Sequence, residues 1–382
     1  MTGAHAFIRS VRRPSGPARS PRRLLAVVAT LLPLTLAAAC TTASGAGSGG
    51  GSGSTPADFA GKTVTLLVPT SAGGGLDGIG RAVAQYLGNY LPGKPRVIVD
   101  NVDGGGGAVG LHQLDSTLPN NGLYVGLLQS PQLLRYVFKA TGFDFDLPGF
   151  ITLGSLRDGG LITTSKKVGT DVKALAASKS PIVIGNADPG GIGGLQNDVG
   201  FKVLKIPYKM VFGYSGTGPI GLAMVRGDVG SCATTYAGYL KTFQPEGNVA
   251  LYQTGYLDGQ GLVRDTTGSE ANVPTVEDLY KQAYGTEPSG PDWDLYKTVA
   301  QMASLGTAFV VRPGTPANFV KALTDGLAKM AADPAAKAPL TKLLGHSPEI
   351  LGPAATQKVE NTYYQLPAST ISQLKALSGL TK

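Results

Sequence analysis

The stretch Thr65–Gly78, TLLVPTSAGGGLDG, runs from an apolar strand pattern through a glycine-rich turn into a helical pattern. Such a turn points backbone N–H groups outward at the positive end of the helix dipole, so it suits phosphate and carboxylate alike. Gly73, Gly75 and Gly78 match the G-x-G-x-x-G pattern of dinucleotide-binding folds. Asp100 follows about 25 residues later, where a ribose-binding acid belongs. The stretch therefore predicts an anion-binding loop, for a dinucleotide or for some other anion.

A second glycine-rich turn, Asn101–Gly110 (NVDGGGGAVG), follows the next apolar run. A dinucleotide-binding fold does not need a turn of this kind after its second strand. Two helix starts that follow neighbouring parallel strands can converge on one ligand. In a chain with 55 glycines, both stretches can also be tight turns without a ligand. The pair nevertheless favours one shared ligand site.

The N-terminal region has the layout of an export signal. Residues 1–23 carry six arginines and no acid, and residues 24–39 form an apolar run that is shorter than the ~20 residues needed to span a bilayer. Small residues before Cys40 resemble a bacterial lipobox, in which the cysteine is lipidated. We expect a lipoprotein signal peptide over 1–39, then lipidated Cys40 and a Gly/Ser-rich tether over 40–59. An ordinary secretory signal and a twin-arginine signal at Arg22-Arg23 are alternatives.

Composition excludes several classes of function. The formal net charge is +8, but six of the positive charges lie in the predicted signal peptide. The rest of the chain therefore lacks the large excess of positive charge that would suit nucleic acid. Once Cys40 is lipidated, Cys232 has no partner for a disulfide. His112 and His346 are the histidines beyond the signal peptide, which is a poor supply for a metal site or a histidine-based triad. We expect no cofactor, no metal and no catalytic residue.

Apolar, β-rich runs alternate with helical patterns along most of the chain. Strands are expected at 63–68, 96–99, 124–128, 161–164, 182–184, 249–254 and 307–311. This alternation predicts an α/β fold with parallel strands covered by helices. About 325 residues follow the signal peptide and tether, which is enough for two α/β domains.

At this point the motifs carry a family resemblance. The two glycine turns resemble the opening of the Bug receptors, the extracytoplasmic solute receptors of tripartite tricarboxylate transporters. Further motifs follow in the family's order over roughly residues 60–360, namely Pro119–Tyr124, Ile206–Lys209, Gly227–Val229, Val273–Glu277, Pro313–Pro316 and Ala332–Pro334. One departure concerns the presumed anion site. Where the family has an arginine and a proline, this chain has Val102 and Asp103.

The resemblance implies a two-lobed, periplasmic-binding-protein-like fold of the type II, Venus flytrap kind. Domain 1 would comprise 60–157 plus 286–382, and domain 2 would comprise 158–285. The ligand would sit between the lobes and touch backbone N–H groups of both glycine turns, residues after the third strand, and a turn of domain 2. Carried over residue by residue, the implied ligand-binding set is Ser71, Ala72, Gly73, Gly74, Gly75, Asp77, Gly105, Gly106, Gly107, Gln129, Ser130, Asn186, Ala187, Asp188, Gly190, Gly191 and Tyr208.

The resemblance also implies a function. The chain would be a non-enzymatic, lipid-anchored receptor at the outer face of the cell membrane. It would bind a small organic di- or tricarboxylate and deliver it to the integral membrane subunits of a tripartite tricarboxylate transporter. One alternative is an exported enzyme with an anionic substrate, for which Asp77, Asp100, Asp103 and Asp188 are candidates. Another is a ligand sensor that takes no part in transport.

Overall fold

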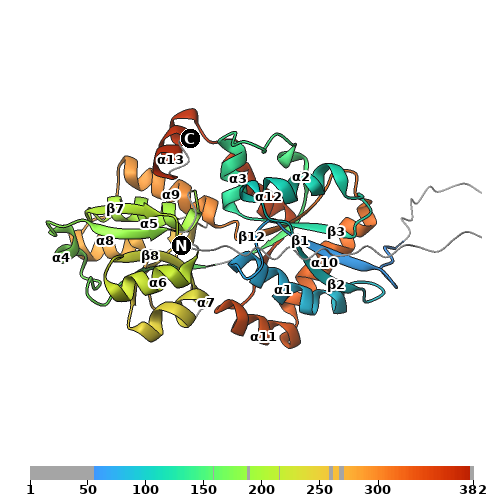
Figure 1. Ribbon diagram of the computed structural model, residues 1–382, viewed down its shortest axis with the longest axis horizontal. Helices are drawn as coiled ribbons and strands as arrows, with labels where there is room; N and C mark the ends of the chain where they lie inside the picture. Colours follow the sequence, from blue (N-terminus) through green and yellow to red (C-terminus); the bar gives the residue numbers. More distant parts are fainter. Residues whose placement is uncertain are drawn as a thin grey trace, which may run out of the picture. The chain divides into compact units, whose positions relative to one another are not determined.

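The structure is a computed structural model that describes residues 56–157, 159–186, 190–214, 216–257, 261–265 and 271–378 (Figure 1). The predicted signal peptide, Cys40 and most of the predicted tether lie outside the described residues. Ala187 and Asp188 of the predicted ligand site lie outside them as well.

The first sheet has six strands in the spatial order β13-β4-β12-β3-β1-β2. Their bounds are β1 Thr63–Val68, β2 Arg96–Asn101, β3 Tyr124–Leu128, β4 Ile151–Leu156, β12 Thr307–Val311 and β13 Ile350–Leu351. Strands β1, β2 and β3 are parallel, as the sequence predicts. The prediction is wrong for β12, which runs antiparallel to both β3 and β4. An apolar run shows that a strand is buried but does not show its direction.

The second sheet has five strands in the order β7-β6-β8-β5-β9. Their bounds are β5 Gly160–Thr164, β6 Ile182–Asn186, β7 Tyr208–Phe212, β8 Ser231–Thr235 and β9 Val249–Gln253. Strand β6 is parallel to β7 and β8, whereas β5 is antiparallel to β8 and β9, so the prediction of parallel strands is wrong for β5 and β9 as well. A separate two-stranded ribbon pairs β10 Tyr256–Leu257 with β11 Leu262–Val263.

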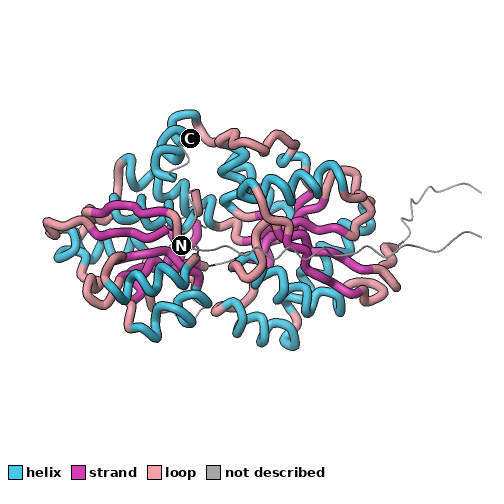
Figure 2. The backbone as a smooth tube through the Cα atoms, viewed as in Figure 1, coloured by secondary structure: helices cyan, strands magenta, loops and turns pink. Residues whose placement is uncertain are grey.

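Helices flank the strands of each sheet (Figure 2). The α-helices are α1 Gly75–Leu87, α2 Ala108–His112, α3 Ser130–Val137, α4 Val172–Ala176, α5 Ile192–Val203, α6 Thr217–Arg226, α7 Tyr236–Gly238, α8 Val276–Tyr284, α9 Pro291–Ala303, α10 Ala317–Ala332, α11 Pro334–Leu344, α12 Pro353–Tyr364 and α13 Ala368–Ser378. Shorter 3-10 or π turns are η1 Gly88–Tyr90, η2 Gly105–Gly107, η3 Gln113–Thr117, η4 Leu147–Gly149, η5 Tyr239–Phe243 and η6 Gln244–Glu246. Within the described residues, every helix is too short or too polar to cross a bilayer.

Strand β1 lies between two layers of helices and is apolar on both faces. Leu66 and Val68 belong to a core cluster with residues of α1, α10 and α11, whereas Leu67 belongs to a cluster with residues of α2, α3 and α12. Full burial of such a side chain contributes about 1.5–3 kcal/mol. Helix α1 approaches β1 closely at Gly80, where a Cβ atom would lie 3.0 Å from Val68 Cγ2. This packing fixes the position of the glycine turn that joins β1 to α1.

The strands of each sheet come from sequence ranges that largely match one of the two predicted domains. Strands of the first sheet fall within 63–156 and 307–351, and strands of the second fall within 160–253. The helices divide differently, because α9 and α13 come from the range predicted for domain 1 but pack against α5, which also contacts the strands of the second sheet. The predicted domain boundaries stay a prediction.

Candidate functional site

Three predicted segments meet at one edge of the first sheet. Val68 pairs with Asn101, and Leu67 pairs with Gly126, so the carboxyl ends of β1, β2 and β3 lie side by side. The segments that follow these strands contain the first glycine turn, the second glycine turn and the start of α3. In open α/β sheets, ligands bind beyond the carboxyl ends of parallel strands. We call this region the glycine edge; it comprises residues 69–77, 102–108 and 129–135.

The first glycine turn presents exposed backbone to open space. Residues 71–75 are exposed. A Cβ atom added at Gly73 or at Gly75 would find no other atom within 4 Å. The first N–H groups of a helix have no acceptor within the helix, so α1 offers them to whatever lies in front of it. The turn can therefore accept an anion that approaches the backbone directly.

A network of hydrogen bonds fixes the shape of this turn. Asp77 Oδ2 accepts from the backbone N–H of Gly73 at 2.8 Å and from Arg81 Nε at 2.9 Å. Arg81 Nη2 also donates to Asn101 Oδ1 at 3.1 Å, and Asn101 Nδ2 donates to the Thr70 carbonyl at 3.1 Å. The hydrogen bond from Arg81 is the main reason that the pKa of Asp77 is lowered. The buried Asp77 carboxylate thus supports the turn from within.

The second glycine turn has an unusual backbone. Gly104, Gly105, Gly106 and Gly107 all have positive φ, at 132°, 59°, 66° and 103°. Residues with a Cβ atom rarely adopt this conformation, so the turn requires glycine. The Ser71 hydroxyl donates to Asp103, whose other carboxylate oxygen accepts from the Gly104 N–H at 2.7 Å. Asp103 therefore joins the two glycine turns.

Two side chains of α3 lie against the second turn, and sequence reasoning missed both. A Cβ atom on Gly106 would lie 2.8 Å from Arg135 Cδ, and one on Gly107 would lie 2.8 Å from Gln132 Cγ. Arg135 thus brings a positive charge to the glycine edge. No local sequence pattern signals either contact, because each depends on how α3 lies over the second turn.

Gln129 and Ser130 lie at the glycine edge, but their side chains have structural partners. Gln129 caps α3 through a reciprocal bond with Gln132, and its Nε2 donates to Thr307 Oγ1 at 2.9 Å. Ser130 is buried, and its Oγ lies 2.6 Å from the Tyr363 hydroxyl. The two side chains and the Gln129 backbone N–H therefore stabilise the fold at this edge.

The second sheet presents a similar edge. Strands β6 and β7 are parallel, with Asn186 paired with Phe212 at their carboxyl ends. Gly190 has a φ of 86°, and Gly191 is the N-cap of α5. The side chain of Asn186 packs against Gly194 in the first turns of α5. The predicted residues Asn186, Gly190 and Gly191 thus lie together where β6 leads into α5.

The structure does not place Tyr208 with these residues. Tyr208 begins β7 and pairs with Ile182, at the amino end of the parallel pair and about 13 Å along the strand from Asn186. Its hydroxyl donates to the buried carboxylate of Asp198. Burial and that bond raise the pKa of Tyr208. The sequence motif around Tyr208 therefore belongs to the packing of α5 against β7.

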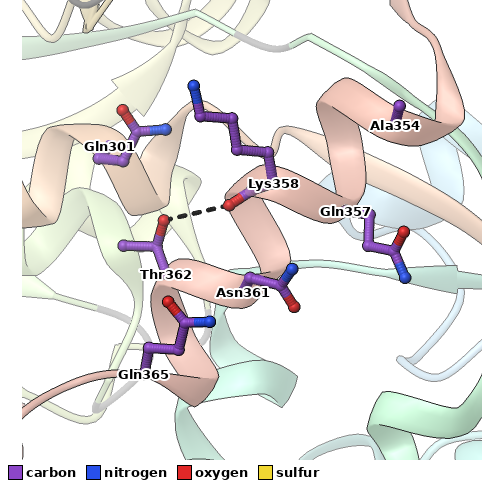
Figure 3. Close-up of a pocket in the computed structure, with 7 residues that line it drawn as sticks. All are labelled: Gln301, Ala354, Gln357, Lys358, Asn361, Thr362 and Gln365. Carbon is purple, nitrogen blue, oxygen red and sulfur yellow. Dashed lines mark hydrogen bonds between the residues drawn. The ribbon is translucent and has the colours of Figure 1, made fainter.

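The glycine edge can bind an anion through its backbone dipoles. Among the described residues, no group of three or more histidine, cysteine, aspartate or glutamate side chains could hold a metal ion. A groove of about 540 Å³ lies away from the glycine edge, between α9 and α12 (Figure 3). It is lined by Gln301, Ala354, Gln357, Lys358, Asn361, Thr362 and Gln365. None of these was predicted as a site residue.

Comparison with known sequences gives a partial relative. No protein-family model matches the chain. A protein described as "UPF0065 protein in the TAR-I ttuE-ttuC' intergenic region" from Agrobacterium vitis is 27% identical over 176 residues. The match spans 44% of this chain and 49% of that protein, so the chain matches about half the length of this curated relative.

Comparison with solved structures covers most of the chain. A TctC solute-binding protein from Polaromonas has a TM-score of 0.56 and 21% identity, covering 83% of this chain and 98% of that one. The periplasmic binding protein BugD has a TM-score of 0.57 and 19% identity, covering 83% and 97%. R. palustris Rpa4515 with adipate has a TM-score of 0.60 and 16% identity, covering 84% and 99%. The two-lobed, periplasmic-binding-protein-like α/β fold is therefore confirmed, and with it the predicted resemblance of this chain to the Bug-type solute receptors.

Proposed function

We propose that this chain is an extracytoplasmic receptor for a small organic di- or tricarboxylate, and that it is not an enzyme. The observation that carries the proposal is the glycine edge. Two glycine turns, joined through Ser71 and Asp103, present helix-start N–H groups beside each other, with open space over the first turn. Neutral dipoles bind carboxylate without burial of an unpaired cation, which is costly.

The ligand would lie between this edge and the carboxyl end of β6. The proposed contacts are the backbone of Ser71, Ala72, Gly74, Gly75, Gly105 and Gly106, with Asn186, Ala187, Asp188, Gly190 and Gly191 from the second lobe. The N–H groups of Gly73, Gly107 and Gln129 already donate within the chain, so these residues would shape the loops around the ligand. Asp77 and Ser130 would support the site from within, as their hydrogen bonds suggest. The solved neighbour that contains adipate, a dicarboxylate, supports this ligand class.

Lipid anchoring and delivery belong to the same proposal. Cys40 would carry the lipid, and the Gly/Ser-rich segment after it would tether the two lobes to the outer face of the membrane. The loaded receptor would pass its ligand to the membrane subunits of a tripartite tricarboxylate transporter. Intact mass of the protein extracted from membranes tests the anchor, since an unmodified Cys40 would contradict it.

Thermal stability of the mature protein across a panel of organic acids tests the ligand class. A ligand present at 100 times its Kd adds about 2.7 kcal/mol to the free energy of unfolding. We expect a shift with a di- or tricarboxylate and none with NAD or inorganic phosphate. A shift with NAD or phosphate alone would overturn the proposal. Turnover of a bound acid, abolished by alanine at Asp103 or Asp188, would show that the chain is an enzyme.

A further inference from the structure

Asp103 is bonded to both glycine turns of the glycine edge. Its side chain is exposed, yet one oxygen accepts from the Ser71 hydroxyl and the other accepts from the Gly104 N–H at 2.7 Å. Ser71 belongs to the first glycine turn and Gly104 to the second. Any anion that touches both turns therefore lies within about one Debye length, ~8 Å, of the Asp103 carboxylate.

Three other charged side chains lie at or beside this edge, namely Asp77, Arg81 and Arg135. Asp77 and Arg81 form an ion pair at 2.9 Å, so together they contribute little net field. Arg135 packs against Gly106 in the second turn, so its positive charge and the Asp103 carboxylate act on a bound anion in opposite directions. Asp103 lies between the two turns and is exposed to solvent. A negative charge thus borders a site whose dipoles attract anions.

We propose that Asp103 is a specificity-determining residue that selects the charge of the bound carboxylate. This inference rests on the proposed function and narrows it. The glycine turns attract a carboxylate, while Asp103 opposes each further negative charge on the ligand. Asp103 thereby shifts the preference of the site towards carboxylates of low net charge, including those that also carry an ammonium group, and away from tricarboxylates. At ~8 Å, with an effective dielectric constant between about 20 and 80, the effect is roughly 3-fold to 30-fold in Kd per unit of ligand charge.

Three acids that differ chiefly in charge provide the test. Tricarballylate, succinate and aspartate carry about three, two and one net negative charges at pH 7. Calorimetric Kd values are measured for the wild-type mature protein and for Asp103→Asn. We expect Asp103→Asn to tighten tricarballylate most and aspartate least, so that the ratio of the tricarballylate Kd to the aspartate Kd falls at least fivefold. High salt should shrink the difference between the two proteins.

Two further variants separate charge from loop order. Asp103→Glu keeps the charge but moves the carboxylate by one methylene group, so the ratio of Kd values should stay near that of the wild type. Asp58→Asn is the matched control, because Asp58 is also an exposed aspartate that accepts a local backbone N–H, from Ala60 at 2.9 Å, but lies before the amino end of β1. An unchanged ratio in Asp103→Asn, or an equal loss for all three acids, would overturn the inference. Failure of the wild type to bind any carboxylate would instead overturn the receptor proposal and this inference with it.

Discussion

Gly75→Ala should change folding stability and ligand affinity in opposite directions. Gly75 is the first residue of α1, its φ is not positive, and a Cβ atom there would contact nothing within 4 Å. Alanine at such a position raises the free energy of unfolding by about 0.4–1 kcal/mol, because the unfolded chain loses freedom. If a carboxylate rests on the Gly75 N–H, the same methyl group excludes it. Loss of a hydrogen bond to a charged partner costs about 1.5–3 kcal/mol, or roughly 10-fold to 100-fold in Kd.

The chain offers a matched control one turn further along the same helix. A Cβ atom on Gly78 would also find open space, but the Gly78 N–H already donates to the Gly74 carbonyl at 3.0 Å. Gly78→Ala should therefore stabilise the fold without loss of affinity. Chemical denaturation gives the stability of each variant, and calorimetry gives the Kd for the carboxylate identified in the panel. If Gly75→Ala is more stable and binds as tightly as the wild type, the ligand does not approach α1 through its backbone.

Two other predictions concern groups that support the glycine edge. Tyr363→Phe removes a buried hydroxyl that lies 2.6 Å from Ser130 Oγ and 2.7 Å from the Met302 carbonyl oxygen, so urea denaturation should show a loss of about 1–3 kcal/mol. An unchanged midpoint would mean that water replaces the hydroxyl. The pKa of Asp77 is lowered from 3.8, chiefly by the hydrogen bond from Arg81, so its stabilisation is present above about pH 4 and disappears as pH falls through the lowered pKa. Asp77→Asn should therefore be less stable than the wild type at pH 6 and should approach it at pH 2, whereas a gap that is independent of pH would contradict this account.

The parallel core of the first sheet could be predicted from local pattern. The run Thr63–Val68 ends in consecutive apolar residues and leads through glycines into an amphipathic helix, which specifies a buried strand followed by a crossover. The place of β12 could not be predicted in this way. Its pairing with both β3 and β4 depends on contacts across more than a hundred residues, and no local signal in Thr307–Val311 encodes its partners or direction.

In the candidate site, too, local features could be predicted and long-range contacts could not. The second glycine turn could be predicted, because a backbone with positive φ favours glycine and the run Gly104–Gly107 shows this in the sequence. Arg135 was not visible, because its contact with Gly106 depends on how α3 lies over the turn. Tyr208 stays a predicted ligand contact. It belongs to a motif that resembles the family, yet its hydroxyl serves Asp198 at the far end of β7.

The position of β12 has a consequence for the order in which the chain can fold during synthesis. Strand β4 reaches β3 through β12, and β13 pairs with β4, so the first sheet stays incomplete until residue 351 has left the ribosome. The second sheet is contiguous from Gly160 to Gln253 and needs no later strand. A nascent chain whose first 260 residues have left the ribosome should therefore hold a complete second sheet beside a first sheet that lacks β12 and β13.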